Sequence, residues 1–138
     1  MQVDSPSRIR NIAVAGHNTT GKTTLVSSLL YTSGAVPRFM RVEDRNTVTD
    51  FDPEEAERGI SIGLAVCFAP WKQHKLNLLD APGYGIFFSE ARSALRAADA
   101  ALICVNTVAG AEVNTEKIWE SAAEFELPVI FHLNKMDR

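Results

Sequence analysis

The sequence predicts an α/β fold, in which a mostly parallel sheet carries helices on both faces. Short apolar runs, typical of buried strands, alternate along the chain with segments whose apolar residues recur at helical spacing. A glycine-rich turn joins the first such strand to the first helix, as in the first unit of an α/β fold. The 138 residues suit one compact domain.

The first strand is expected at residues 9–15, an apolar run that ends in Gly16. Helical spacing begins at Lys22, and Gly34 is expected to end that helix. The apolar residues that recur at this spacing are Leu25, Val26, Leu29 and Leu30.

A long irregular segment is expected at residues 35–59, because it contains prolines and scattered charges but no sustained apolar period. A loop of this length in a compact domain is usually functional or mobile. Within it, the acidic run at residues 53–57 is expected to form a short solvated helix.

Apolar runs predict four further strands, and polar residues 72–75 fit a hairpin turn between the first two of them. The last strand is expected to be buried, with His132 as a core residue. The four strands are expected at residues 60–68, 76–79, 100–105 and 128–133. The helix before the last strand has its inner face at Val113, Ile118, Ala122 and Phe125.

The composition excludes several classes of protein. With 46% hydrophobic residues, 22% charged residues and a net charge of −3, the chain has no strong electrostatic reason to bind nucleic acid or anionic membrane. No apolar stretch is long enough to cross a bilayer. Cys67 and Cys104 stand singly, so we expect neither a zinc site nor a disulfide framework. A protein without disulfides is expected in the reducing cytoplasm. Residues 1–8 form a polar leader without the apolar core of a secretion signal.

Residues 16–23 match the phosphate-loop pattern G-x-x-x-x-G-K-[ST]. Its glycines let backbone N–H groups turn toward a diphosphate at the positive end of the following helix. Lys22 would bridge the terminal phosphates, and the Thr23 hydroxyl would ligate Mg²⁺. A glycine-rich turn that happens to precede a lysine is the weaker interpretation, because a strand precedes the motif and a helix follows it. The predicted nucleotide-binding residues here are Gly16, His17, Asn18, Thr19, Thr20, Gly21, Lys22, Thr23 and Thr24.

A second motif, Asp80-Ala81-Pro82-Gly83, directly follows the strand at residues 76–79. A carboxylate at a strand end can hold Mg²⁺, usually through a water, and a glycine N–H can contact a γ-phosphate. Taken alone, D-x-P-G is more often a plain turn. Its position after the long irregular segment favours the phosphate-sensing interpretation.

The third motif, Asn134-Lys135-Met136-Asp137, follows the last predicted strand. Guanine presents its N1–H and N2–H₂ donors side by side, and a carboxylate at Asp137 would accept from both, a pair that adenine cannot form. Asn134 would meet the O6/N7 edge, and the stem of Lys135 would lie over the ring. If the tetrapeptide stood alone, a solvated strand end would be the better interpretation. As the third of three ordered motifs, the tetrapeptide favours GTP over ATP.

Together with Arg58-Gly59-Ile60-Ser61-Ile62, these motifs resemble the translational GTPases, above all elongation factor G and its paralogues. The resemblance runs from about Ile9 to Arg138 and implies a three-layer P-loop NTPase fold, with a GTP-binding domain at residues 9–138. It implies switch I at about 35–62, switch II at about 81–92, and a GTPase switch stimulated by the ribosome. The implied Mg²⁺ ligands are Thr23, Ser61 and Asp80, and the implied catalytic residues are Lys22, Gly83 and Tyr84.

Three residues depart from that family's usual pattern. Ser61 replaces threonine but keeps the hydroxyl that Mg²⁺ needs. Thr19 replaces aspartate, which argues against an auxiliary monovalent-cation site. Tyr84 stands where the family has its catalytic histidine, and a phenol with a pKa of about 10 donates a hydrogen bond but is a poor base near neutrality. Hydrolysis that is slowed but real is therefore expected.

The chain ends at Arg138, directly after the guanine motif, so we expect a GTPase domain truncated after its fifth strand, with reduced affinity for GTP. The resemblance implies a monomer that contacts the ribosome through domains outside this chain, with no membrane and no sequence-specific nucleic acid as partner. Two alternatives stay open: a nucleotide-dependent binding module with negligible hydrolysis, and a P-loop protein that uses ATP.

Overall fold

A computed structural model describes residues 5–44, 47–49, 53–58 and 60–138. Five strands form one sheet in the order β2-β3-β1-β4-β5. The strands are β1 (Ile9–Gly16), β2 (Ala65–Trp71), β3 (His74–Asp80), β4 (Ala100–Asn106) and β5 (Val129–Asn134). The helices are α1 (Lys22–Thr32), α2 (Pro53–Arg58), α3 (Phe88–Ala97) and α4 (Val113–Glu124), with 3-10 turns at Pro6–Arg8, Val42–Asp44 and Gly85–Phe87.

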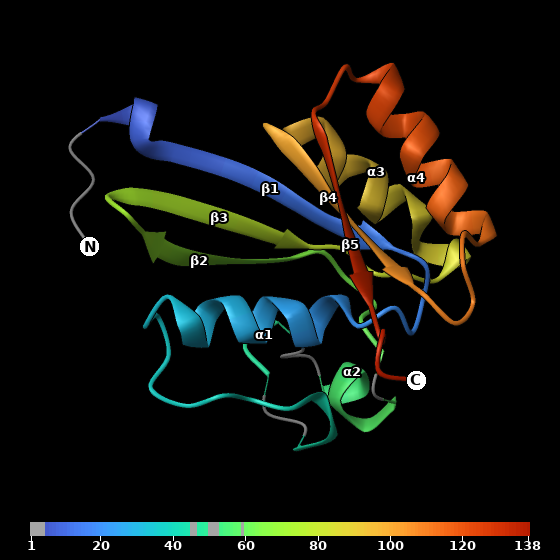
Figure 1. Cartoon of the computed structure of the whole chain (residues 1–138), viewed down its shortest axis with the longest axis horizontal. Helices are drawn as coiled ribbons and strands as arrows, with labels where there is room; N and C mark the ends of the chain where they lie inside the picture. The colour runs from blue at the N-terminus through green and yellow to red at the C-terminus, as the bar shows by residue number, and fades with distance from the viewer. Residues whose placement is uncertain (1–4, 45–46, 50–52, 59) are drawn as a thin grey trace.

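Helices cover both faces of the sheet, as predicted: α1 lies on one face, and α3 and α4 lie on the other (Figure 1). β1 serves both layers because its side chains alternate. Val14 packs with Val26 of α1, whereas Ala13 and Ala15 pack toward α3 and α4. The α/β three-layer fold is therefore confirmed.

The sheet is parallel except at β2. β1 pairs in parallel with β3 and β4, and β4 pairs in parallel with β5, whereas β2 pairs with β3 in antiparallel register. The carboxyl ends of four strands therefore meet at one edge of the sheet, where ligands of such folds gather. The three sequence motifs all follow strands that end at this edge.

The predicted hairpin joins β2 to β3 through a two-residue turn. Lys72 and Gln73 have φ values of 44° and 66°, the left-handed pair that a tight hairpin of matching twist requires. His74, expected in the turn, is the first residue of β3.

The prediction of a strand over residues 60–68 was wrong at its start, because β2 begins only at Ala65. The backbone N–H groups of Ile62 and Gly63 donate to the Glu55 carboxylate at 2.8 and 3.0 Å instead of joining a strand. The expected helix at 53–57 is present as α2, yet Glu55 is only 3% exposed, so this acidic residue is buried.

The burial predicted for the last strand was also wrong. β5 lies at the edge of the sheet, where Ile130 and Leu133 are 64% and 54% exposed and His132 is only half-buried. In α4, Ile118 and Ala122 are buried as expected, but Val113 in the first turn is 63% exposed. An apolar run alone does not distinguish an edge strand from a central one.

Among the described residues, no helix combines the length and apolar character needed to span a bilayer.

Both cysteines are predicted to resist alkylation in the native protein. Cys67 and Cys104 are buried free thiols, and burial raises the pKa of each to about 12. The charge of Lys22 lowers the pKa of Cys104, and the charge of Asp80 raises the pKa of both thiols, but burial is the largest effect at each. At pH 8 roughly one such thiol in ten thousand is ionised, and the thiolate is the nucleophile. We expect no reaction with iodoacetamide by mass spectrometry until guanidinium unfolds the chain. Rapid labelling of the folded protein would contradict this burial.

Candidate functional site

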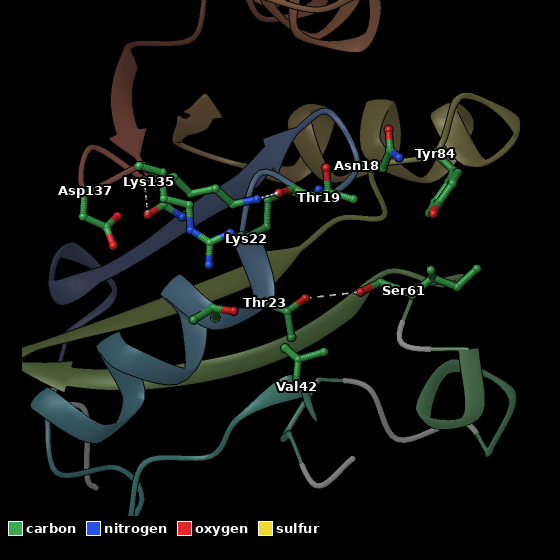
Figure 2. A pocket seen from close by; sticks show the side chains of 15 residues that line it. Asn18, Thr19, Lys22, Thr23, Val42, Ser61, Tyr84, Lys135 and Asp137 are labelled. Carbon is green, nitrogen blue, oxygen red and sulfur yellow. Dashed lines mark hydrogen bonds between the residues drawn. The ribbon is translucent and has the colours of Figure 1, made fainter. Parts of the chain in front are cut away.

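A pocket of about 660 Å³ opens at the carboxyl edge of the sheet, within the range of small-ligand sites. Figure 2 shows its lining side chains, which come from the loop after β1, the start of α1, the segment between α1 and β2, and the turns after β3 and β5. They are Asn18, Thr19, Gly21, Lys22, Thr23, Thr24, Val42, Ile60, Ser61, Gly83, Tyr84, Asn134, Lys135, Asp137 and Arg138.

The loop after β1 curls around the Lys22 ammonium. Lys22 Nζ and Thr20 Oγ1 both donate to the backbone carbonyl of His17, at 2.8 and 2.9 Å. Gly21 caps α1 with a left-handed φ of 89°, a conformation that costs glycine little. The backbone N–H groups that begin α1 and the charge of Lys22 therefore meet at one end of the pocket, a favourable arrangement for phosphate.

The turn after β3 lies directly against this loop. A Cβ atom at Gly83 would overlap Lys22 Nζ and would lie 2.7 Å from the backbone nitrogen of Asn18. Gly83 is therefore required by close approach of two loops. Tyr84, the next residue, is half-buried, and Figure 2 shows it with Asn18 at the end of the pocket opposite Asp137.

Two of the three predicted Mg²⁺ ligands are brought together. Thr23 Oγ1 and Ser61 Oγ lie 3.3 Å apart, although 38 residues separate them in the chain. Asp80, the third, is only 1% exposed at the end of β3, and its Oδ2 accepts a hydrogen bond from Thr49 Oγ1 at 2.8 Å. Two hydroxyls and one carboxylate are hard oxygen donors, and this set suits a Mg²⁺ ion that takes its remaining ligands from phosphate and water.

The last motif is anchored to the first by two long-range hydrogen bonds. Asn134 Nδ2 donates to the carbonyl of Thr20 at 2.9 Å, and Lys135 Nζ donates to the carbonyl of Thr19 at 2.7 Å. Thr107 Oγ1 supports the motif from the end of β4, since it donates to the carbonyl of Asn134 at 2.9 Å. Asp137 remains exposed at the pocket rim.

Some predicted site residues lie beside the pocket and do not line it. Gly16, Thr20, Asp80, Ala81 and Pro82 are buried behind it. His17 faces Glu112, with Nε2 3.4 Å from Oε1. Met136 is 74% exposed and does not line the pocket. The nucleotide-binding roles of all these residues stay predictions.

Sequence reasoning missed several residues of the site. Val42 and Arg138 line the pocket, Thr49 bonds to Asp80, and Asn114 Nδ2 donates to the carbonyl of Gly83 at 2.7 Å. Thr49 lies in a segment with no periodic signal, and Asn114 resembles any polar residue in the first turn of a helix. Spacing gives no signal for either, because their partners are 31 residues away in the chain.

Residues 7–138 match the family model of the elongation factor Tu GTP binding domain. The chain belongs to this family. The similarity to translational GTPases predicted from the three motifs is thereby confirmed, and the chain is a GTP-binding domain of that type.

Similar proteins include two translation factors and one solved structure. Mitochondrial ribosome-releasing factor 2 of Candida dubliniensis is 44% identical over 132 residues, which cover 96% of this chain and 16% of that protein. Elongation factor G 2 of Streptomyces coelicolor is 38% identical over 138 residues, which cover 100% of this chain and 20% of that protein. A crystal structure of a protein from Thermus thermophilus matches with a TM-score of 0.91 and 44% identity, covering 95% of this chain and 20% of the other. The chain thus spans a fifth or less of the length of these proteins.

Gly83→Ala is predicted to weaken binding of GTP by about fivefold to a hundredfold, because the new methyl group must displace Lys22 or the loop backbone and such overpacking costs about 1–3 kcal/mol. Gly63→Ala is the matched control, since a Cβ at Gly63 meets nothing within 4 Å. Calorimetric titration of both variants measures the difference. Equal affinities for the two variants would show that the two loops do not approach each other as described.

Proposed function

We propose that this domain binds Mg·GTP and hydrolyses it to GDP and phosphate, as the switch of an elongation-factor-G-like translation factor. The observation that carries the proposal is a single pocket with a phosphate-binding end at Lys22 and a candidate guanine-selecting carboxylate at Asp137. The family of the chain supports it.

At the phosphate end, Lys22 and the N–H groups at the start of α1 hold the phosphate oxygens. Thr23, Ser61 and Asp80 hold Mg²⁺, which when bound neutralises the charge that develops on the β- and γ-phosphates. Thr49 orients Asp80 through its 2.8 Å hydrogen bond, so one oxygen of that carboxylate has a fixed direction.

At the γ-phosphate, the N–H of Gly83 donates a hydrogen bond to a terminal oxygen, and the Tyr84 phenol orients the attacking water. Phosphoryl transfer depends mainly on positioning and on charge stabilisation, so a hydroxyl that donates one hydrogen bond supports turnover. A phenol accepts a proton poorly near neutrality, so hydrolysis is slower than with an imidazole at this place.

At the other end of the pocket, Asp137 selects guanine by accepting from N1–H and N2–H₂ together. Asn134 and Lys135 place this carboxylate, because both side chains are bonded to the loop after β1. Base and phosphate recognition are thereby tied to the same backbone.

The proposed activator is the ribosome. The names of the similar proteins, ribosome-releasing factor 2 and elongation factor G 2, support a role in translation. We place the domain in a monomeric protein of the reducing cytoplasm, consistent with its two free thiols. Release of phosphate from GTP tests this role when it is measured with and without added ribosomes on this domain within a protein that carries the ribosome-contacting domains. A rate that ribosomes do not change would favour the alternative that Tyr84 suggests, a binding module with negligible hydrolysis.

Tyr84→His is predicted to accelerate ribosome-stimulated hydrolysis by about tenfold or more, because an imidazole both orients water and accepts its proton. Tyr84→Phe removes the hydroxyl and is the matched control, for which a slower rate is expected. Single-turnover phosphate release measures both. No acceleration with histidine would refute a deficit in water positioning.

Asp137→Asn is predicted to lower the affinity for GTP by about a hundredfold or more and to favour xanthosine triphosphate, because xanthine has an acceptor where guanine has its amine. Competition binding with both nucleotides measures the shift. A variant that still prefers GTP would remove Asp137 from its assigned role.

A further inference from the structure

The first turn of α4 contacts both loops at the phosphate end of the pocket. Glu112, the residue that caps α4, lies beside His17 of the loop after β1. Two residues later, Asn114 Nδ2 donates to the carbonyl of Gly83 at 2.7 Å, and the Asn114 side chain is buried, with 7% exposure. One short stretch of chain therefore holds the two segments that would flank a γ-phosphate.

Gly83 needs such a restraint. The close approach of Lys22 and Asn18 excludes any side chain at this position, and glycine has the widest backbone freedom of all residues. The carbonyl that Asn114 binds belongs to the peptide unit between Gly83 and Tyr84. A fixed direction for this carbonyl therefore sets the rotation of Gly83 and the direction in which the chain leaves toward Tyr84.

We propose that Asn114 is a positioning residue that holds the Gly83–Tyr84 peptide in the orientation required by a nucleotide with a γ-phosphate. The inference rests on the proposed function of Gly83 and Tyr84. Asn114 itself does not line the pocket and acts only through these two residues.

The segment after β3 has a second attachment to α4 at its far end. Arg92 of α3 donates to Ser121 Oγ at 3.2 Å and to Glu124 Oε1 at 2.6 Å. The Arg92–Glu124 pair is largely exposed, and exposed ion pairs contribute little. The bond from Asn114 is buried, where loss of the donor leaves the Gly83 carbonyl without that partner. Of these two polar attachments, the bond from Asn114 is therefore the stronger restraint on the Gly83 carbonyl.

The two nucleotide states depend differently on this bond. A triphosphate uses the N–H of Gly83, whereas a diphosphate has no group at that place. Loss of Asn114 therefore weakens binding of the triphosphate and leaves binding of GDP nearly unchanged, since a ligand responds only to interactions that differ between the two states.

The test compares Asn114→Asp, Asn114→Ala and the control Val113→Ala in the purified protein. Asp has the size of Asn but turns an acceptor toward the Gly83 carbonyl, whereas Ala only removes the donor. Calorimetry with GDP and with a non-hydrolysable GTP analogue gives the affinity ratio of the two. We expect the triphosphate-to-diphosphate ratio to fall about tenfold for Asp and about threefold for Ala, with GDP affinity within about twofold of wild type. Val113 is exposed, and its variant should keep the wild-type ratio.

An unchanged triphosphate-to-diphosphate affinity ratio overturns the inference. An equal loss of affinity for both nucleotides, or a larger effect for Ala than for Asp, also overturns it, because either result would mean that Asn114 only contributes to packing. Wild-type protein that binds no GTP refutes the proposed function instead. If the Asn114 variants do not fold, NMR of the wild-type protein replaces them, with solvent exchange of the Asn114 side-chain amide as the measured quantity. Its protons should exchange with solvent more slowly with the GTP analogue than with GDP, and equal exchange in both states overturns the inference.

Discussion

Parallel pairing of β1 with both of its neighbours is the constraint on which the whole site depends. In register, Val14 lies opposite Asp80 and Gly16 lies opposite Cys104, so β3, β1 and β4 end on the same edge of the sheet, each two residues beyond the one before. The loops that leave these strands are distant in the chain, and the shared edge brings them together. The backbone bond from Ala81 to Val14, at 3.0 Å, continues the pairing into the turn after β3.

Above that edge, glycines and asparagines act in pairs. Gly21 and Gly83 stand where another segment comes too close for a side chain, and each lies beside an asparagine amide that binds a nearby carbonyl. Asn134 holds the loop that contains Gly21, and Asn114 holds Gly83 itself. Glycine permits the close approach, and the amide supplies the restraint that glycine lacks. All of these bonds run from a side chain to the backbone, so they fix loop shape regardless of the neighbouring side chains.

The architecture was largely readable from the sequence because it depends on local signals. The apolar period gave α1 with its end before Gly34, and the glycine-rich motif gave the junction of β1 and α1. The start of β2 could not be predicted from the sequence, because it depends on the buried Glu55 carboxylate. This carboxylate accepts hydrogen bonds from two backbone N–H groups that would otherwise pair within the strand. The exposure of β5 was not readable either, since its position at the sheet edge is a property of the whole topology.

The candidate site divides in the same way. Residues such as Lys22 belong to contiguous motifs and were found by pattern, whereas Thr49 and Asn114 reach the site only through folding and carry no pattern of their own.

The central claim is that one sheet edge binds Mg·GTP and selects its base. Calorimetric titration of the purified protein with Mg·GTP and with Mg·ATP tests it most directly. We expect GTP to bind roughly a hundredfold or more tighter than ATP, and equal binding of the two nucleotides, or binding of neither, would contradict the claim.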